Sequence, residues 1–166
     1  MALTLTSANF KEGGMLALDH ILSADYGFGC GGGNKSPQLA WSGAPAGTRS
    51  FAVHCFDPDA PTGSGFWHWV VVNIPATVSE LKLDAGNPAA GLLPKGALQT
   101  RTDFGKPGYG GPCPPEGHGP HRYQFTLFAV KQDALPVTAD TSAAIVGFQL
   151  HFNTLEKAVL TAKFQR

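Results

Sequence analysis

Three runs of apolar residues dominate the hydrophobic pattern of this chain, at residues 49–56, 66–74 and 122–130. Their apolar positions either alternate or follow one another, without the three-and-four spacing of an amphipathic helix. The first two runs are largely apolar on both faces, and a proline-containing segment closes each of them. We therefore predict three long β-strands, of which the first two lie in the centre of a sheet.

Weaker patterns predict the remaining strands. Residues 3–6 and 38–42 are short candidates, and the tail at residues 158–164 alternates enough to return as a strand. Residues 83–102 show no sustained period, so we expect an irregular connection that holds at most one short element.

Only one stretch predicts a helix. Asp140 or Thr141 is suited to cap its N-terminus, because a short side chain with an oxygen atom can accept from free backbone N–H groups. Its mostly apolar body, which includes Ile145 and Phe148, runs to about Asn153. Because strands dominate, the predicted fold class is mainly β, an all-β sandwich with one or two short peripheral helices.

Composition agrees with this fold and narrows the partners. The chain has 166 residues, with 21 glycines and 13 prolines, which suits one loop-rich domain over residues 1–166 and not a long helical bundle. Twelve basic residues balance twelve acidic ones, so the net charge is zero. General binding to nucleic acid or to an anionic membrane needs a positive field, so we expect no nucleic-acid partner.

The cysteines and the N-terminus bear on location. Three cysteines, Cys30, Cys55 and Cys113, cannot all pair within one chain, and we expect free thiols in a reducing compartment. The first ten residues lack the basic segment and apolar core of a signal peptide. No apolar run approaches the roughly 20 residues of a transmembrane helix, so the expected location is cytoplasmic.

His68 is the first candidate for chemistry. It lies in a strand that is apolar on both sides, where an imidazole must find a hydrogen-bond partner or line a cavity. A fully satisfied core histidine is the plainer interpretation. The sequence leaves both open.

His121 and Tyr123 are the next candidates. They stand two residues apart at the start of the third strand, so they point to the same face, which continues into the core. Packing at the end of a strand would also explain them. Arg122 points the opposite way, and its expected role is structural.

Two aspartates and a stiff loop complete the candidate site. Asp57 and Asp59 follow the first strand, where aspartates commonly cap their own turn. Residues 109–120 hold four glycines and four prolines, and glycine lets backbone N–H groups approach a ligand closely. Because all these groups lie near strand ends, we predict that the aspartates, His68, His121 and Tyr123 line one concave site.

These motifs resemble the phosphatidylethanolamine-binding protein family. The similarity rests on DPDAP at residues 57–61, His68 in an aromatic and valine-rich strand, GPCPP at 111–115 and HRY at 121–123. SPQLAW at residues 36–41 resembles a further stretch of the family. The compact length and the cysteine in the proline loop resemble its bacterial Raf-kinase-inhibitor-like branch.

The resemblance implies a Greek-key β-sandwich with a small anion pocket for phosphate or phosphoryl head groups. It implies a non-enzymatic binding protein without a cofactor. A protein partner such as a kinase, and a homodimer, are further expectations. The implied pocket residues are Asp57, Asp59, Pro61, His68, Pro114, His121 and Tyr123, completed by the loop at Gly111, Pro112 and Cys113. It also favours a cis peptide bond between Ala60 and Pro61.

The charge in such a pocket needs an explanation, because two carboxylates would repel an anion. An ionised aspartate beside a histidine raises the pKa of the imidazole and favours imidazolium. Imidazolium, the Tyr123 hydroxyl and loop N–H groups would then donate to phosphate oxygens. This hypothesis predicts tighter phosphate binding at pH 6 than at pH 8.

Three other functions stay open. A hydrolase could use a His/Asp pair, or Cys113 with His121 as a nucleophile pair. A protein-interaction module would inhibit a partner enzyme. His118 and His121, with the two aspartates, also have residue types suited to a divalent metal.

Overall fold

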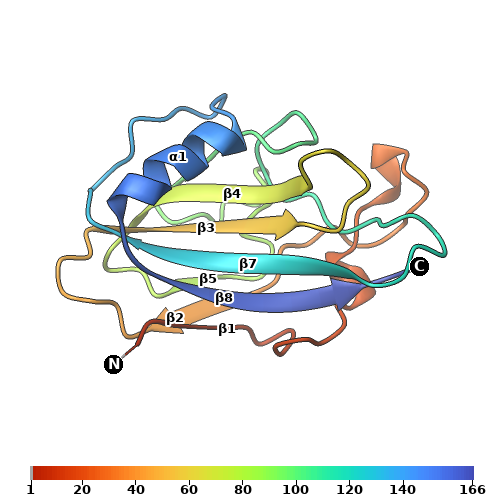
Figure 1. The fold of residues 1–166 in the computed structure, drawn as a ribbon, viewed down its shortest axis with the longest axis horizontal. Helices are drawn as coiled ribbons and strands as arrows, with labels where there is room; N and C mark the ends of the chain where they lie inside the picture. Colours follow the sequence, from red (N-terminus) through yellow and green to blue (C-terminus); the bar gives the residue numbers. More distant parts are fainter. Residues whose placement is uncertain (1) are drawn as a thin grey trace.

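Two antiparallel β-sheets pack face to face in the computed structural model, which describes residues 2–166 (Figure 1). The larger sheet has the strand order β6 (Leu98–Gln99), β4 (Phe66–Pro75), β3 (Ser50–Asp57), β7 (His121–Val130) and β8 (Thr154–Phe164). The smaller sheet has the order β1 (Thr4–Thr6), β2 (Leu39–Ser42) and β5 (Glu80–Leu81). The predicted mainly β sandwich is therefore confirmed.

The core forms where alternate residues of the central strands meet the smaller sheet. β3 pairs with β4 on one side and β7 on the other, which fits its apolar character on both faces. Val53 and Cys55 of β3 and Phe125 of β7 point inward and pack with Leu39 and Trp41 of β2. This inner face leads directly to the strand ends that carry the candidate site residues.

Helix α1 (Ala143–Asn153) lies against the outer face of the larger sheet (Figure 1). The predicted caps are wrong, because the N-cap is Ser142, whose side chain accepts from the N–H of Ile145. The Thr141 hydroxyl instead accepts from the N–H of Thr138. Two short 3-10 turns, Leu18–His20 and Ala24–Tyr26, precede β2.

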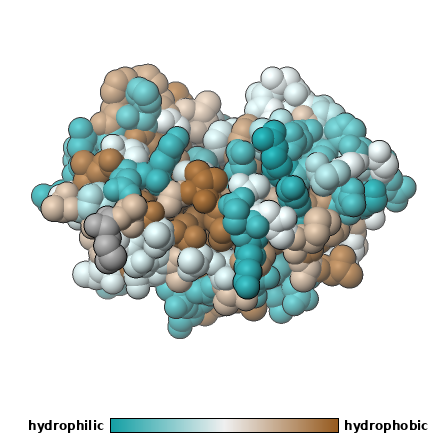
Figure 2. All heavy atoms as spheres, turned by 60° about the horizontal axis from the view of Figure 1, so that its bottom comes forward, coloured by the Kyte–Doolittle hydropathy of each residue, from teal (hydrophilic) through white to brown (hydrophobic). Residues whose placement is uncertain are grey.

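The buried face of α1 differs from its apolar body in the sequence. Val146 and Leu150 pack on the sheet, whereas Ile145, Phe148 and Phe152 are each more than half exposed. β8 also begins earlier than predicted, at Thr154, immediately after the helix. Figure 2 shows the side of the molecule that carries β1 and β8, where apolar side chains interrupt a mostly hydrophilic surface.

Two of the three cysteines form a disulfide, so the expectation of free thiols is wrong for them. Cys30 and Cys113 are joined with an S–S distance of 2.09 Å, and only Cys55 remains free and buried. The reason is tertiary packing, because the loops that carry them are 83 residues apart in sequence yet lie side by side. The N–H of Leu22 donates to the Pro112 carbonyl in the same contact.

Two further backbone findings concern the predictions. No peptide bond within residues 2–166 is cis, so the expected cis bond between Ala60 and Pro61 is wrong. None of the helices formed by these residues has the length and apolar character needed to span a membrane.

Candidate functional site

A small cavity opens where β3 ends and β7 begins. Its volume is about 190 Å³, less than the roughly 300 Å³ or more of a pocket for a drug-sized ligand. The predicted site residues that line it are Asp57, Pro61, His68, Cys113, Pro114, His121 and Tyr123. The other lining residues are Leu22, Phe28, Ala60, Thr62, Phe66, Phe104 and Pro115. The predicted convergence therefore holds for all its members except Asp59.

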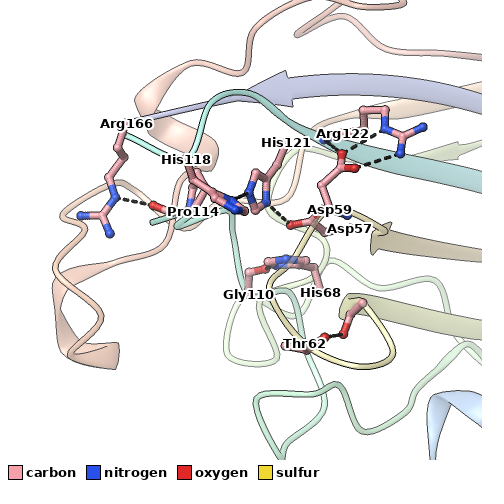
Figure 3. A network of polar contacts seen from close by, with 11 residues as sticks. Asp57, Asp59, Thr62, His68, Gly110, Pro114, His118, His121, Arg122 and Arg166 are labelled. Carbon is pink, nitrogen blue, oxygen red and sulfur yellow. Dashed lines mark hydrogen bonds and ion pairs between the residues drawn. The ribbon is translucent and has the colours of Figure 1, made fainter. Parts of the chain in front are cut away.

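Asp59 faces away from the cavity and holds β7 in place. Its carboxylate accepts from the Nε and Nη2 atoms of Arg122 at 3.0 and 2.9 Å, and from the Arg122 backbone N–H at 2.9 Å (Figure 3). The guanidinium of Arg122 lowers the pKa of Asp59 to about 2. This pair explains the structural role that the sequence predicted for Arg122.

Gly111 and Pro112 also lie outside the cavity lining. They belong to the loop behind the cavity and hold that loop in place. The Gly111 N–H donates to Asn34 Oδ1 at 2.8 Å and is therefore engaged within the protein. A Cβ atom at Gly111 would lie 2.2 Å from the His20 carbonyl oxygen, so only glycine fits this contact. The amide of Asn34, a residue with a φ of 52°, thus anchors the loop.

Asp57, His121 and His118 form a chain of hydrogen bonds (Figure 3). His121 Nδ1 donates to Asp57 Oδ2 at 2.7 Å, and His121 Nε2 lies 2.6 Å from His118 Nδ1. Asp57 and His121 are buried, whereas His118 is exposed. The sequence indicated His118 only through its spacing from His121, as a possible metal ligand, and residues 2–166 contain no cluster of three potential metal ligands.

His68 reaches the cavity through a β-bulge. Cys55 and Phe56 are consecutive on β3 but pair with Trp69 and Trp67 on β4, so His68 is the extra residue. A bulge redirects a side chain, which a strict period of two cannot predict.

The surroundings of His68 favour the neutral form of its ring. Burial lowers its pKa, outweighing the opposing effects of the Gly110 carbonyl and the Asp57 charge. Its Nδ1 lies 2.7 Å from the Gly110 carbonyl oxygen, so the single proton sits on Nδ1 and Nε2 is an acceptor. The predicted rise in the pKa of His68 is therefore wrong for the unliganded pocket, because desolvation outweighs the charge of Asp57.

The Tyr123 hydroxyl is the donor left without a partner. No hydrogen bond within residues 2–166 involves this hydroxyl, and burial raises the pKa of Tyr123, so the hydroxyl keeps its proton. Both oxygens of Asp57 are engaged, because Oδ1 accepts from the Asp59 N–H at 2.8 Å. A ligand therefore meets a hydroxyl donor beside an imidazole acceptor.

Aromatic rings surround these polar groups. Phe104 contacts His68, Phe66 and Phe28, with ring centroids 5.6, 4.8 and 6.0 Å apart. Such an apolar wall lowers the local dielectric constant and strengthens electrostatic contacts inside. Phe28 and Phe104 lie in loops without any motif, so nothing in the sequence marked them.

A profile described as "Phosphatidylethanolamine-binding protein" matches residues 6–165. The chain belongs to the phosphatidylethanolamine-binding protein family. The UPF0098 protein YbcL of Escherichia coli is 52% identical over 164 residues, covering 99% of this chain and 88% of the relative. The UPF0098 protein YbhB of the same organism is 49% identical over 160 residues, covering 96% and 98%.

Solved structures agree with this family assignment. The crystal structure of Escherichia coli YbcL has a TM-score of 0.96 at 51% identity, covering 100% of this chain and 99% of that one. A putative homologue of the phosphatidylethanolamine-binding protein from Chlamydia trachomatis, CT736, has a TM-score of 0.82 at 25% identity, with 99% and 98% covered. Membership of the phosphatidylethanolamine-binding protein family supports a role in binding.

Proposed function

We propose that this protein is a non-enzymatic binding protein for a small phosphorylated ligand, such as phosphate or a phosphoryl head group. The observation that carries this proposal is the free Tyr123 hydroxyl beside His68 in a cavity of about 190 Å³. A hydroxyl donor and an imidazole at a water-poor site suit phosphate oxygens. The remaining predicted site residues contribute the walls, and Asp59, Gly111 and Pro112 support them.

Phosphate binding at this pocket takes up a proton. Neutral His68 has no free N–H for a phosphate oxygen, because its single proton donates to Gly110. Either His68 gains a second proton beside the anion, or a protonated phosphate donates to Nε2. In both cases the complex holds one proton more than the free pocket and a free phosphate dianion together. The affinity for phosphate therefore rises as the pH falls from 8 to 6.

Calorimetric titration with inorganic phosphate and with O-phosphoethanolamine tests the proposal. Affinity should be greater at pH 6 than at pH 8, and buffers of different ionisation heat should report proton uptake. Tyr123→Phe should weaken binding by about 1.5–3 kcal/mol, because a hydrogen bond to a charged group is lost. Absence of binding at both pH values, or affinity that increases with pH, would overturn the proposal.

A hydrolase is the alternative, and the 2.7 Å contact between Asp57 and His121 favours it. Cys113 does not supply its nucleophile, because its sulfur is bonded to Cys30. A panel of phosphoester and ester substrates separates the two functions, since a binding protein gives no turnover.

Location and partners complete the proposal. The cytoplasmic expectation depended in part on free thiols, and a disulfide between Cys30 and Cys113 is instead typical of an oxidising compartment. A relative in Mycobacterium tuberculosis, 35% identical over 147 residues, carries the name putative lipoprotein LppC, which agrees with that location. A homodimer and modulation of a partner enzyme such as a kinase are tested by ultracentrifugation and by pull-down with and without free phosphate.

A further inference from the structure

Both nitrogens of His121 are occupied within the protein. Asp57 holds Nδ1 at 2.7 Å, and the ring of His118 holds Nε2 at 2.6 Å (Figure 3). His121 lines the cavity, but His118 does not. The buried histidine therefore offers no hydrogen-bonding atom to a ligand while His118 stays in place.

His118 lies in a turn that is weakly held. Residues 115–118 are exposed, and the glycines on both sides, Gly117 and Gly119, have left-handed φ angles of 75° and 87°. The backbone makes two hydrogen bonds here, from Gly117 N–H to the Arg166 carbonyl and from His118 N–H to the Pro115 carbonyl. Few bonds and high exposure allow a segment to open locally at small cost.

We propose that His118 is an internal competitor for the ligand site: it occupies Nε2 of His121 in the free protein, and a phosphoryl oxygen replaces it on binding. This inference rests on the proposed function. In the free protein His121 Nε2 accepts from the His118 Nδ1–H, because the proton of His121 lies on Nδ1 and donates to Asp57. When a protonated phosphate binds, its proton passes to Nε2, which then donates to a charged oxygen, and such a hydrogen bond is about twice as strong as a neutral one. The displaced ring loses little, because it moves to solvent.

The Asp57 carboxylate makes the exchange favourable. With Nδ1 donating to Asp57, a His121 that also donates to phosphate carries a proton on each nitrogen and lies between two negative groups. The other charged side chains near the turn are Glu116 and Arg166, which pair with each other at 3.6 Å. Neither contacts the His118 or His121 ring in a polar contact within residues 2–166.

Affinity measurements on three variants test the competition. His118→Ala removes the competitor and should tighten phosphate binding about fivefold, the equivalent of one ordinary hydrogen bond. His118→Asn keeps a short polar group near Nε2 and should lie between the wild type and His118→Ala. His151→Ala, an exposed histidine on α1, is the matched control and should bind like the wild type.

Imidazole nitrogen NMR gives a second measurement. If His118 had a purely structural role, the result would not change when phosphate binds. The free protein should show coupling between His118 Nδ1 and His121 Nε2 across the shared N–H, and saturating phosphate should abolish it. Equal or weaker binding by His118→Ala, or coupling that persists with phosphate bound, would overturn this inference alone. If neither wild type nor variant binds phosphate or O-phosphoethanolamine, the proposed function fails and the inference with it.

Discussion

Neighbouring strands of the larger sheet each carry a histidine, His68 of β4 on the inner face and the partly buried His54 of β3 on the outer face, but only His68 meets a cavity. His68 lines the cavity, and its Nδ1 is 2.7 Å from the Gly110 carbonyl. On the outer face, His54 packs edge-on against Trp67 and Phe128, with ring centroids 4.8 and 4.9 Å apart. Its Nδ1 is buried and has no hydrogen-bond partner among residues 2–166.

Desolvation by itself does not distinguish these histidines. Desolvation lowers the pKa of both, to about 4 for His54. The difference lies in their neighbours. The Gly110 carbonyl accepts from one ring nitrogen of His68, and the ring of His68 lines a cavity. A buried imidazole in a strand therefore marks a candidate site only when both conditions hold, and His54 meets neither.

Removing the disulfide should have the largest effect on stability. The disulfide cross-links loops at the cavity end of the sandwich and not on the outer face. Cys30→Ser with Cys113→Ser should lower the free energy of unfolding by about 2–4 kcal/mol, since the crosslink closes a separation of 83 residues. Urea unfolding of the double variant and the wild type measures this loss. Equal stabilities, or three reactive thiols in the unreduced unfolded wild type, would contradict it.

Acid should have the next largest effect on stability, through His54 on the outer face. His54 has a pKa of about 4 in the folded protein against an ordinary value of 6.5, so the unfolded chain binds the proton first. Stability therefore falls as the pH drops from 6.5 to 4, by about 3 kcal/mol over that window. His54→Leu should remove most of this loss, as measured by urea unfolding at pH 7 and pH 4.5. An unchanged loss in the variant would show that another group causes it.

Ligand binding should respond only to the inner histidine. His68→Ala should weaken phosphate binding by about 1.5–3 kcal/mol, because a contact to a charged group disappears. The fold should survive, since Phe125 and Leu127 pack the core beyond the cavity. His54→Leu is the matched control and should bind phosphate like the wild type in calorimetry. If His68→Ala binds normally, His68 is a core histidine as well.

The smallest effect concerns the exposed ion pair beside the cavity. Arg122→Gln should leave the free energy of unfolding almost unchanged, because exposed ion pairs contribute little, and Arg49→Gln should behave alike at its pair with Asp133. Phosphate affinity should not change, since Arg122 and Asp59 lie outside the cavity lining. A large loss of phosphate affinity in Arg122→Gln would show that the ligand site extends to Arg122.

The sequence alone determined the strands and the end of the sandwich at which chemistry gathers. Alternation is local, so Asp57 could be placed on the face of Cys55, and His121 with Tyr123 on the face of Phe125, without knowledge of the fold. The family motifs share these positions, which is why the resemblance and the predicted sandwich agree with the structure.

Tertiary structure decided what depends on contacts between distant segments. The bulge that turns His68 inward comes from the pairing of β3 with β4. The disulfide joins loops 83 residues apart, and Phe104 reaches the cavity from a loop without a motif. The bond between His118 and His121 needs a particular turn. Such contacts depend on packing across the whole chain, and no local period encodes them.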